Sequence, residues 1–291
     1  MNRVITSVQD TIDTLHNGDF ERGEFIFRGQ VNCNWEIIPS LLRFDRSFAS
    51  SFEAATFEPI LQGIMSPYAI SNDPLEHLIL LQHFSIPTRL LDWTSEILVA
   101  LFFACFDPKN ENTHQDGKFL IVQRNHYPIL KFNLIANEIY KQPFQADTAS
   151  ELFRKRLYLD NIYIFEPVIK NPRMRIQDSC FMLFPFSTLE PSTLEFMTLD
   201  NYRRVRNKVI TKDNEGLSED EIMNKKIWIA HKLVDKNCKL SILKELEIKY
   251  GICKETLFIE TEFIKNVNPY FENLEIKARE KAEWLRNQRT K

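Results

Sequence analysis

Glycine is scarce in this chain, with 7 residues among 291, whereas phenylalanine occurs 23 times. So few glycines exclude collagen-like, linker-rich and low-complexity classes, and they argue against a glycine-rich loop around a nucleotide phosphate. The 5 cysteines are odd in number and never form a Cys-x-x-Cys pair, so neither a disulfide framework nor a zinc knuckle is indicated. We therefore expect a reducing, cytoplasmic location.

Long apolar runs and an excess of one charge are also lacking. The longest apolar stretch, residues 97–106, is roughly half of what a bilayer span requires, and the first residues contain no apolar run of signal-peptide length. The 37 basic and 40 acidic side chains give a formal net charge of -3, which argues against a dominant phosphate-binding surface. Neither a membrane nor a nucleic acid is expected as a partner.

What the sequence does contain is a mixture of short helix-like and strand-like segments. Apolar spacing and capping residues predict helices at 7–15, 47–65, 74–84 and 149–159, and an apolar helix directly after Thr94. Runs of β-branched and aromatic residues predict strands at 25–27, 117–122, 162–169 and 175–184. Pro59 is expected to bend or split its helix.

After Pro191 the sequence becomes charged and helical in pattern, with expected helices at 218–235, 240–250 and 270–289. The order of elements predicts an α+β fold, a small mixed or antiparallel sheet core flanked by helices. We expect residues 1–190 to form this α+β domain. Residues 191–291 are expected to form a helical region that packs on the core or extends it.

Two polar stretches interrupt this apolar pattern near strand ends. In Phe27–Gln30, an arginine precedes a glycine at the end of a strand, where its planar fork of donors suits a phosphate or carboxylate. In Pro87–Thr94, Arg89 and Asp92 lie among leucines and a tryptophan. Charges there are costly unless they are paired or used, so these two either form an ion pair or face a ligand cleft.

A third polar stretch surrounds Gln177. Strand alternation over Arg175–Phe184 would put Arg175, Gln177, Ser179 and Phe181 on one face. No histidine has a carboxylate or cysteine at ligand spacing, so no metal site is predicted.

Several motifs together resemble those of the FRG domain family. They are Phe27–Gln30, Trp35–Arg43, Leu81–Phe84, Ile86–Thr94 and Ala100–Ala104, and they occur in the family's order. The resemblance covers residues 25–125 and, more weakly, the stretch around Gln177. The family pattern has a glycine two residues after that glutamine, whereas this chain has Ser179.

A more distant resemblance implies a mechanism. A strand ending in Arg-Gly, a strand ending in Thr before an apolar helix, and a late polar strand are similar to ADP-ribosyltransferases of the Arg-Ser-Glu type. The comparison implies that Arg28 binds the phosphates or ribose of NAD, that Thr94 matches the hydroxyl residue of the second motif, and that Gln177 falls near the catalytic Glu. The residues assigned to NAD binding are Phe27, Arg28, Gly29, Gln30, Arg89, Trp93 and Thr94, and those assigned to catalysis are Arg28, Asp92 and Gln177.

The glutamine at the position of the Glu has a chemical consequence. Cleavage of the nicotinamide–ribose bond builds positive charge on the ribose, which a carboxylate stabilises and a neutral amide does not. Either another acid supplies the charge, with Asp92 the first choice and Glu166 or Asp178 next, or the chain binds a nucleotide without efficient turnover.

The leading hypothesis is a cytoplasmic FRG domain enzyme that uses NAD as a substrate. It would transfer ADP-ribose or hydrolyse NAD, in the manner of a toxin that acts as a stress or phage-defence effector. The alternative is a non-enzymatic module that senses a nucleotide and docks a protein partner or antitoxin through the helical C-terminal region. A nuclease would need an acidic metal cluster, which the spacing does not reveal.

Overall fold

The computed structural model describes residues 4–16, 25–61, 74–124, 162–167, 172–184, 194–198, 227–259 and 262–289. Within these residues, a seven-stranded sheet has the order β4-β5-β2-β1-β3-β7-β6. Every neighbouring pair is antiparallel except β6 and β7, which are parallel. The strands are β1 Phe25–Gln30, β2 Leu90–Thr94, β3 Gly117–Gln123, β4 Tyr163–Phe165, β5 Ser179–Leu183, β6 Leu194–Thr198 and β7 Ile227–Val234. The α+β class with a mixed sheet is therefore confirmed.

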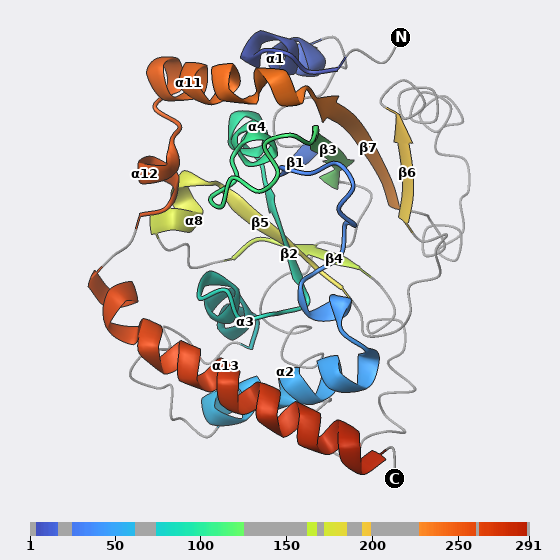
Figure 1. Cartoon of the computed structure of the whole chain (residues 1–291), viewed down its shortest axis with the longest axis vertical. Helices are drawn as coiled ribbons and strands as arrows, with labels where there is room; N and C mark the ends of the chain where they lie inside the picture. Colours follow the sequence, from blue (N-terminus) through green and yellow to red (C-terminus); the bar gives the residue numbers. More distant parts are fainter. Residues whose placement is uncertain are drawn as a thin grey trace, which may run out of the picture.

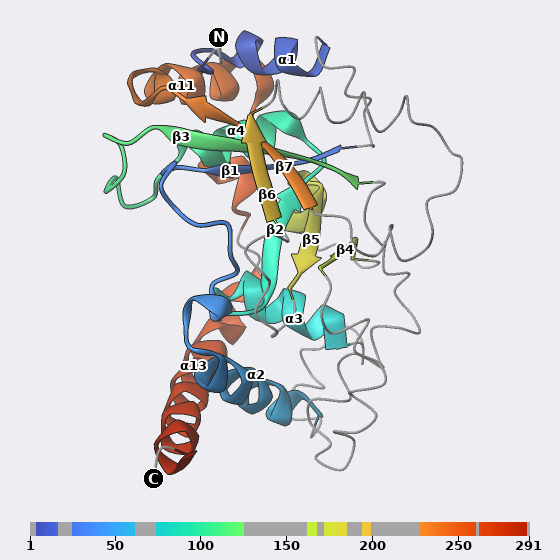
Figure 2. The same cartoon turned by 90° about the vertical axis from the view of Figure 1, so that its right-hand side faces the viewer.

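The helices gather in two groups at opposite ends of the molecule (Figure 1). One group contains α1 Val8–His16, α4 Ile97–Cys105, α11 Lys239–Tyr250 and α12 Lys254–Leu257. The other contains α2 Arg46–Leu61, α3 Pro74–His83 and α13 Glu262–Arg289, and Figure 2 shows the same separation from the side. The short helix α8 Pro172–Ile176 lies between them, and the 3-10 helices η1 Leu41–Arg43 and η4 Lys236–Cys238 connect strands to helices.

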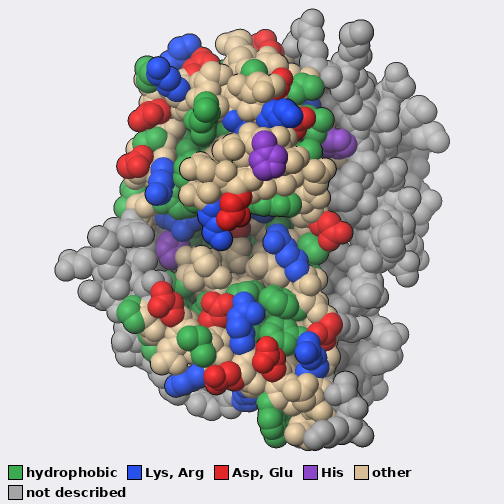
Figure 3. All heavy atoms as spheres, in the orientation of Figure 1, with side chains coloured by type: hydrophobic (Ala, Val, Ile, Leu, Met, Phe, Trp, Pro, Cys, Tyr) green, Lys and Arg blue, Asp and Glu red, His purple; other side chains and the backbone are tan. Residues whose placement is uncertain are grey.

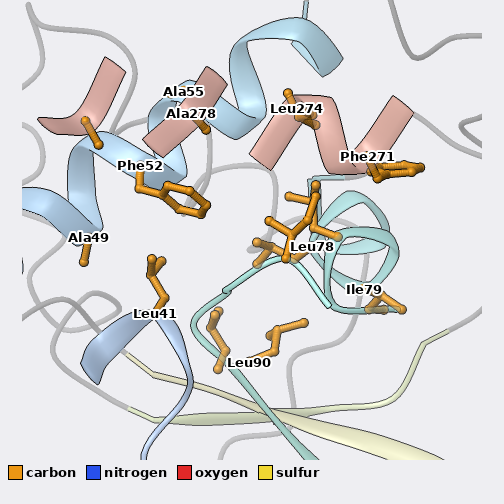
Figure 4. Close-up of a cluster of buried hydrophobic side chains, with 14 of the residues drawn as sticks. Leu41, Ala49, Phe52, Ala55, Leu78, Ile79, Leu90, Phe271, Leu274 and Ala278 are labelled. Carbon is orange, nitrogen blue, oxygen red and sulfur yellow. The ribbon is translucent and has the colours of Figure 1, made fainter. Parts of the chain in front are cut away.

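The two groups of helices have separate hydrophobic cores. In the first, α1, α4 and α11 pack on β1, β3 and β7 around buried Phe25 and Phe119. In the second, α2, α3 and α13 enclose Phe52, Leu78 and Phe271, and Figure 4 shows side chains of this cluster between the three helices. A third apolar cluster, around Trp93, is made by side chains of several central strands. The pocket described below lies where these cores meet.

The structure corrects the expected strand over 175–184. The chain is helical from Pro172 to Ile176, and β5 begins only at Ser179. Proline suits the first position of a helix, because its missing N–H has no intrahelical partner there. Asp178 then takes a φ of 41°, in the left-handed region, which lets the chain turn from α8 into β5. Gln177 therefore lies in a turn, not on a strand face.

The expected helix over 218–235 is also wrong in its described part. Residues Ile227–Val234 form β7, which pairs with β3 along 117–121. The pattern IWIAHKLV is rich in β-branched and aromatic residues, and its pairing with the buried strand β3 favours the extended form. The region beyond residue 191 thus contributes β6 and β7 to the sheet as well as helices.

The remaining expectations have mixed outcomes. The helices at 7–15, 74–84 and 240–250 and the strands at 25–27 and 117–122 are confirmed, and α2 runs through Pro59 as one helix. The strand expected at 162–169 covers only 163–165, and the helix expected at 149–159 lies outside the described residues. No described helix combines the length and apolarity that crossing a bilayer requires.

Candidate functional site

A pocket of about 540 Å³ opens beside the ends of β1 and β2. Its walls come from α3, α4, the loop after α4, and the segment from α8 into β5. In Figure 3 the surface is recessed between the half that carries α4 and α11 and the half that carries α2 and α13. A volume of this size suits a small-molecule ligand, for which pockets of roughly 300–1,000 Å³ are usual.

Arg28 reaches the pocket from the end of β1. Its Nη1 donates a hydrogen bond to the main-chain oxygen of Asp92, across the β1–β2 pair that Phe27 and Thr94 establish. Burial lowers the pKa of the guanidinium, and the carboxylate of Asp92 opposes that shift. Because arginine keeps its proton in proteins, Arg28 provides a half-buried positive charge. Its Nε has no hydrogen-bond partner among the described residues.

Asp92 is the carboxylate of the pocket nearest to this charge. It is the exposed residue in β2, whose other four residues are buried. Its Oδ2 accepts a hydrogen bond of 2.8 Å from Nε2 of Gln82, on α3. The sequence analysis left open whether Asp92 pairs with Arg89 or faces a cleft, and the structure places it in the pocket.

Two further titratable residues face Asp92 from other elements. Burial, aided by the charge of Arg173, lowers the pKa of His83 to about 4, and Asp92 opposes this. His83 is therefore uncharged near neutral pH. Burial also lowers the pKa of Arg173, again against Asp92, and its guanidinium lies 4.7 Å from the ring centroid of Phe258. His83 lies in the motif Leu81–Phe84, but the sequence assigned no role to it, and none to Arg173.

Thr94 and Gln177 lie together, and both are engaged with the main chain. The Thr94 hydroxyl donates to the main-chain oxygen of Gln177 and accepts from the N–H of Glu96 at 2.9 Å, at the start of α4. The Gln177 amide donates to the main-chain oxygen of Leu257 at 2.9 Å. In this arrangement the two side chains join β2, α8 and α12, and they shape the pocket wall.

Arg89 does not line the pocket. Its side chain is 2% exposed and pairs with Glu53 of α2, with Nε 3.0 Å from Oε1. Its Nη1 also donates to the main-chain oxygen of Phe184. Arg89 was expected among the NAD-binding residues, but its guanidinium lies in the core and away from the pocket. Its partner there, Glu53, is 36 residues away in sequence.

The other residues assigned to NAD binding, which are Phe27, Gly29, Gln30 and Trp93, also line the pocket. The rings of Phe27 and Trp93 belong to buried clusters, and that of Phe27 lies 5.9 Å from the ring of Phe119. Gln30 is buried, and its Nε2 donates to the main-chain oxygen of Glu36. A Cβ on Gly29 would overlap the main chain of α4 at Ala100, so the glycine permits this close packing.

Sequence reasoning missed the aromatic side of the pocket. Trp35, which is 44% exposed, lines it together with the half-buried Phe103 and Phe106. The position of Trp35 inside the motif-bearing segment 35–43 was the available signal.

Of the alternative acids, Glu166 pairs with Arg124, and Asp178 lies in the turn before β5. No group of three or more His, Cys, Asp or Glu residues suited to a metal ion occurs in the part of the chain that the structure describes.

Residues 23–113 match the model of the FRG domain family, which confirms the resemblance found in the motifs. The chain thus carries an FRG domain, and this domain supplies Arg28, Gln82, His83 and Asp92 to the pocket. No curated protein and no solved structure matches the chain.

Proposed function

We propose that this FRG domain protein binds NAD in the pocket and cleaves its nicotinamide–ribose bond, as an ADP-ribosyltransferase or an NAD glycohydrolase. The observation that carries the proposal is the meeting of Arg28, Arg173 and the carboxylate of Asp92 in one pocket of about 540 Å³. Two guanidinium groups suit the pyrophosphate of a dinucleotide. The exposed ring of Trp35 offers a stacking surface for a base.

The reaction asks little covalent chemistry of the protein. When the bond between C1′ and the pyridinium nitrogen breaks, the electron pair stays on the nitrogen and neutral nicotinamide leaves. The ribose carries positive charge until an oxygen of water or of an acceptor attacks C1′ and releases its proton to the solvent. In this proposal the Asp92 carboxylate stabilises that charge, the part that the comparison with ADP-ribosyltransferases gave to a Glu.

A second candidate is nucleotide binding without turnover. It is favoured by the residue at position 177, which is a glutamine and not the Glu that the resemblance implies for catalysis. The amide of Gln177 donates a hydrogen bond to the main-chain oxygen of Leu257. In that case the protein is a nucleotide-sensing module, and its C-terminal helices dock a partner or antitoxin. Under the first candidate, loss of NAD or modification of a target in the cytoplasm suits a stress or phage-defence effector.

The deciding experiment follows nicotinamide release by chromatography, with purified protein and NAD, with and without cell extract as a source of acceptor. Asp92→Asn is expected to lower the rate by about 100-fold or more, since it removes the charge and keeps the shape. Arg28→Ala is expected to abolish NAD binding with little loss of stability. The matched controls are Asp13→Asn and Arg286→Ala, which change exposed side chains outside the pocket.

Each result has a defined meaning. Release that persists only in extract identifies a transferase, and release in buffer alone identifies a hydrolase. NAD binding in calorimetry without release supports the second candidate. An Arg28→Ala variant with unchanged NAD affinity and a much lower melting temperature would make Arg28 a structural residue.

A further inference from the structure

We propose that Thr88 and Gln82 are positioning residues for Asp92, and that they form a polar relay which presents an amide N–H to its carboxylate. The inference rests on the proposed function, in which Asp92 stabilises charge on the ribose. Neither residue touches the reacting atoms in this proposal. Their role is to fix the orientation of the Asp92 carboxylate, which does.

The relay begins at the buried hydroxyl of Thr88, which is 1% exposed. Its oxygen accepts a hydrogen bond of 3.1 Å from the N–H of Leu90, the first residue of β2. The hydroxyl donates its own proton to Oε1 of Gln82, at 2.5 Å. The side chain of Thr88 is thus held by the main chain of the same strand that carries Asp92.

Gln82 connects Thr88 to Asp92 in the pocket. Its Nε2 donates to Oδ2 of Asp92 at 2.8 Å, while its Oε1 faces Thr88. An amide turned by 180° would bring its oxygen against the carboxylate, so that two acceptors would meet without a proton between them. The Thr88 hydroxyl stabilises the observed orientation because it donates to the amide oxygen.

The relay holds one carboxylate oxygen of Asp92 in place, because Oδ2 accepts the N–H of Gln82. The main-chain oxygen of Asp92 is fixed as well, by Nη1 of Arg28. The groups that face Asp92 from the neighbouring elements are Arg28 on β1, His83 on α3 and Arg173 on α8, and none of them is acidic.

The first test compares nicotinamide release by four single variants and one double variant with that of the parent protein. Gln82→Met removes both hydrogen bonds of the amide and keeps a side chain of similar length. Thr88→Val removes the hydroxyl, and Thr88→Ser retains it. Thr56→Val is the matched control, because Thr56 is also 1% exposed, and its hydroxyl donates to Glu53 on α2, outside the pocket.

We expect Gln82→Met and Thr88→Val to lower kcat by as much as about 100-fold, because the carboxylate is no longer held in the productive geometry, with KM for NAD nearly unchanged. Thr88→Ser should keep the parent's kcat, and so should Thr56→Val. The double variant Thr88→Val/Gln82→Met should be no slower than Gln82→Met, since Thr88 acts through Gln82. Unchanged kcat in Gln82→Met, multiplied losses in the double variant, or failure of Thr88→Ser would overturn the proposal.

A second measurement does not depend on activity. The side-chain amide signals of Gln82, assigned in ¹⁵N-labelled protein by their absence in Gln82→Met, report the hydrogen bond to Asp92. They should shift in Asp92→Asn and in Thr88→Val, and stay in place in Thr88→Ser. If the signals stay in place in both Asp92→Asn and Thr88→Val, the relay is refuted even if the protein cleaves NAD. Signals that move as expected in a protein that releases no nicotinamide would retain the relay and refute the enzymatic function.

Discussion

Arg89 and Glu53 form an ion pair inside the apolar core between α2 and β2. Nε of Arg89 lies 3.0 Å from Oε1 and 3.2 Å from Oε2 of Glu53, and the side chains are 2% and 3% exposed. Burial raises the pKa of Glu53, and the positive charge of Arg89 works against that rise. The pair therefore compensates two charges that the core could not hold singly.

Removing one partner should be far more harmful than removing both. Arg89→Met is expected to lower the free energy of unfolding by about 3–5 kcal/mol, because it leaves the Glu53 carboxyl buried without its counter-charge. The double variant Arg89→Met/Glu53→Leu should recover much of that loss. Urea denaturation measures both, with Arg286→Ala as the control, since its pair with Asp45 is exposed to solvent and adds little to stability. Equal losses in Arg89→Met and Arg286→Ala would contradict the assignment.

His83 makes a separate prediction about pH. Its pKa in the folded protein is about 4, lowered chiefly by burial, whereas an unfolded histidine titrates near its ordinary value of 6.5. Between these values the unfolded chain binds the extra proton, so the folded state loses stability as the pH falls from about 6.5 to about 4.

The expected loss from this one group is at most about 3 kcal/mol over that window. In His83→Asn the stability curve should be flatter than in the parent between these pH values. His114→Asn, which changes an exposed histidine outside the pocket, is the matched control. Denaturant midpoints at several pH values give both curves, and parallel curves for the parent and His83→Asn would show that His83 titrates normally in the folded state.

At the scale of elements, α4 lies directly against the backbone of two strands. A Cβ on Gly29 of β1 would overlap the carbonyl oxygen of Ala100, and a Cβ on Gly117 of β3 would overlap that of Ala104. Gly29 pairs with Phe119, so both contacts fall on neighbouring strands of the same ladder. The scarcity of glycine in the chain makes these two positions informative, because each permits a close helix–strand contact.

Gly29→Ala should destabilise the protein by about 3 kcal/mol or more, since α4 must move away from β1. Gly251→Ala serves as the control. Gly251 has a φ of 65° at the end of α11, and a Cβ there would meet no atom within 4 Å, so only about 1 kcal/mol of backbone strain is expected. Thermal unfolding of the two variants compares the costs. An equal decrease would mean that α4 adjusts freely to a side chain at Gly29.

Local patterns predicted those elements whose signals lie within the element itself. The helix that begins at Pro74 and the strand that begins at Phe25 are examples, because proline suits the first position of a helix and aromatic and β-branched residues favour a strand. The strand β7 was mistaken for a helix because its stability comes from pairing with β3, which lies more than a hundred residues earlier in the chain. Tertiary pairing of this kind leaves no mark in a local window.

The candidate site was predictable to the same degree. Arg28 and Asp92 stand out as charges in apolar segments, and the structure brings both to the pocket. Arg89 has the same appearance in sequence, yet Glu53 removes it from the pocket, and that partner lies on another helix. Arg173 reaches the pocket from α8, a helix that the local sequence pattern did not predict. A charged residue in an apolar segment therefore predicts a functional or structural role for the charge. It does not tell whether the charge lines a ligand site or belongs to a buried ion pair.

At the scale of the whole molecule, the FRG match covers less of the structure than the pocket requires. Residues 23–113 contain β1 and β2, but β3, which pairs with β1 from Phe25 to Gln30, begins at Gly117. The other partner of β2 is β5, at 179–183. Lys239 of α11 is 3% exposed, and its Nζ donates to the main-chain oxygen of Val31, inside the matched region. The domain is thus completed by segments that follow it.

A fragment limited to residues 23–113 should therefore fail to fold on its own. It would expose both outer edges of the β1–β2 pair and the apolar side chains that β3, β5 and α13 cover in the full chain. A single two-stranded pair is at best marginally stable in water.

Amide dispersion in NMR spectra and thermal melts followed by circular dichroism provide the measurement, with the full chain as the control. The fragment should show narrow dispersion and no cooperative transition, and it should bind no NAD because Arg173 is absent. A sharp melt with dispersed signals would mean that the matched region is an autonomous domain, and that β3, β5 and β7 are additions to a sheet that is stable without them.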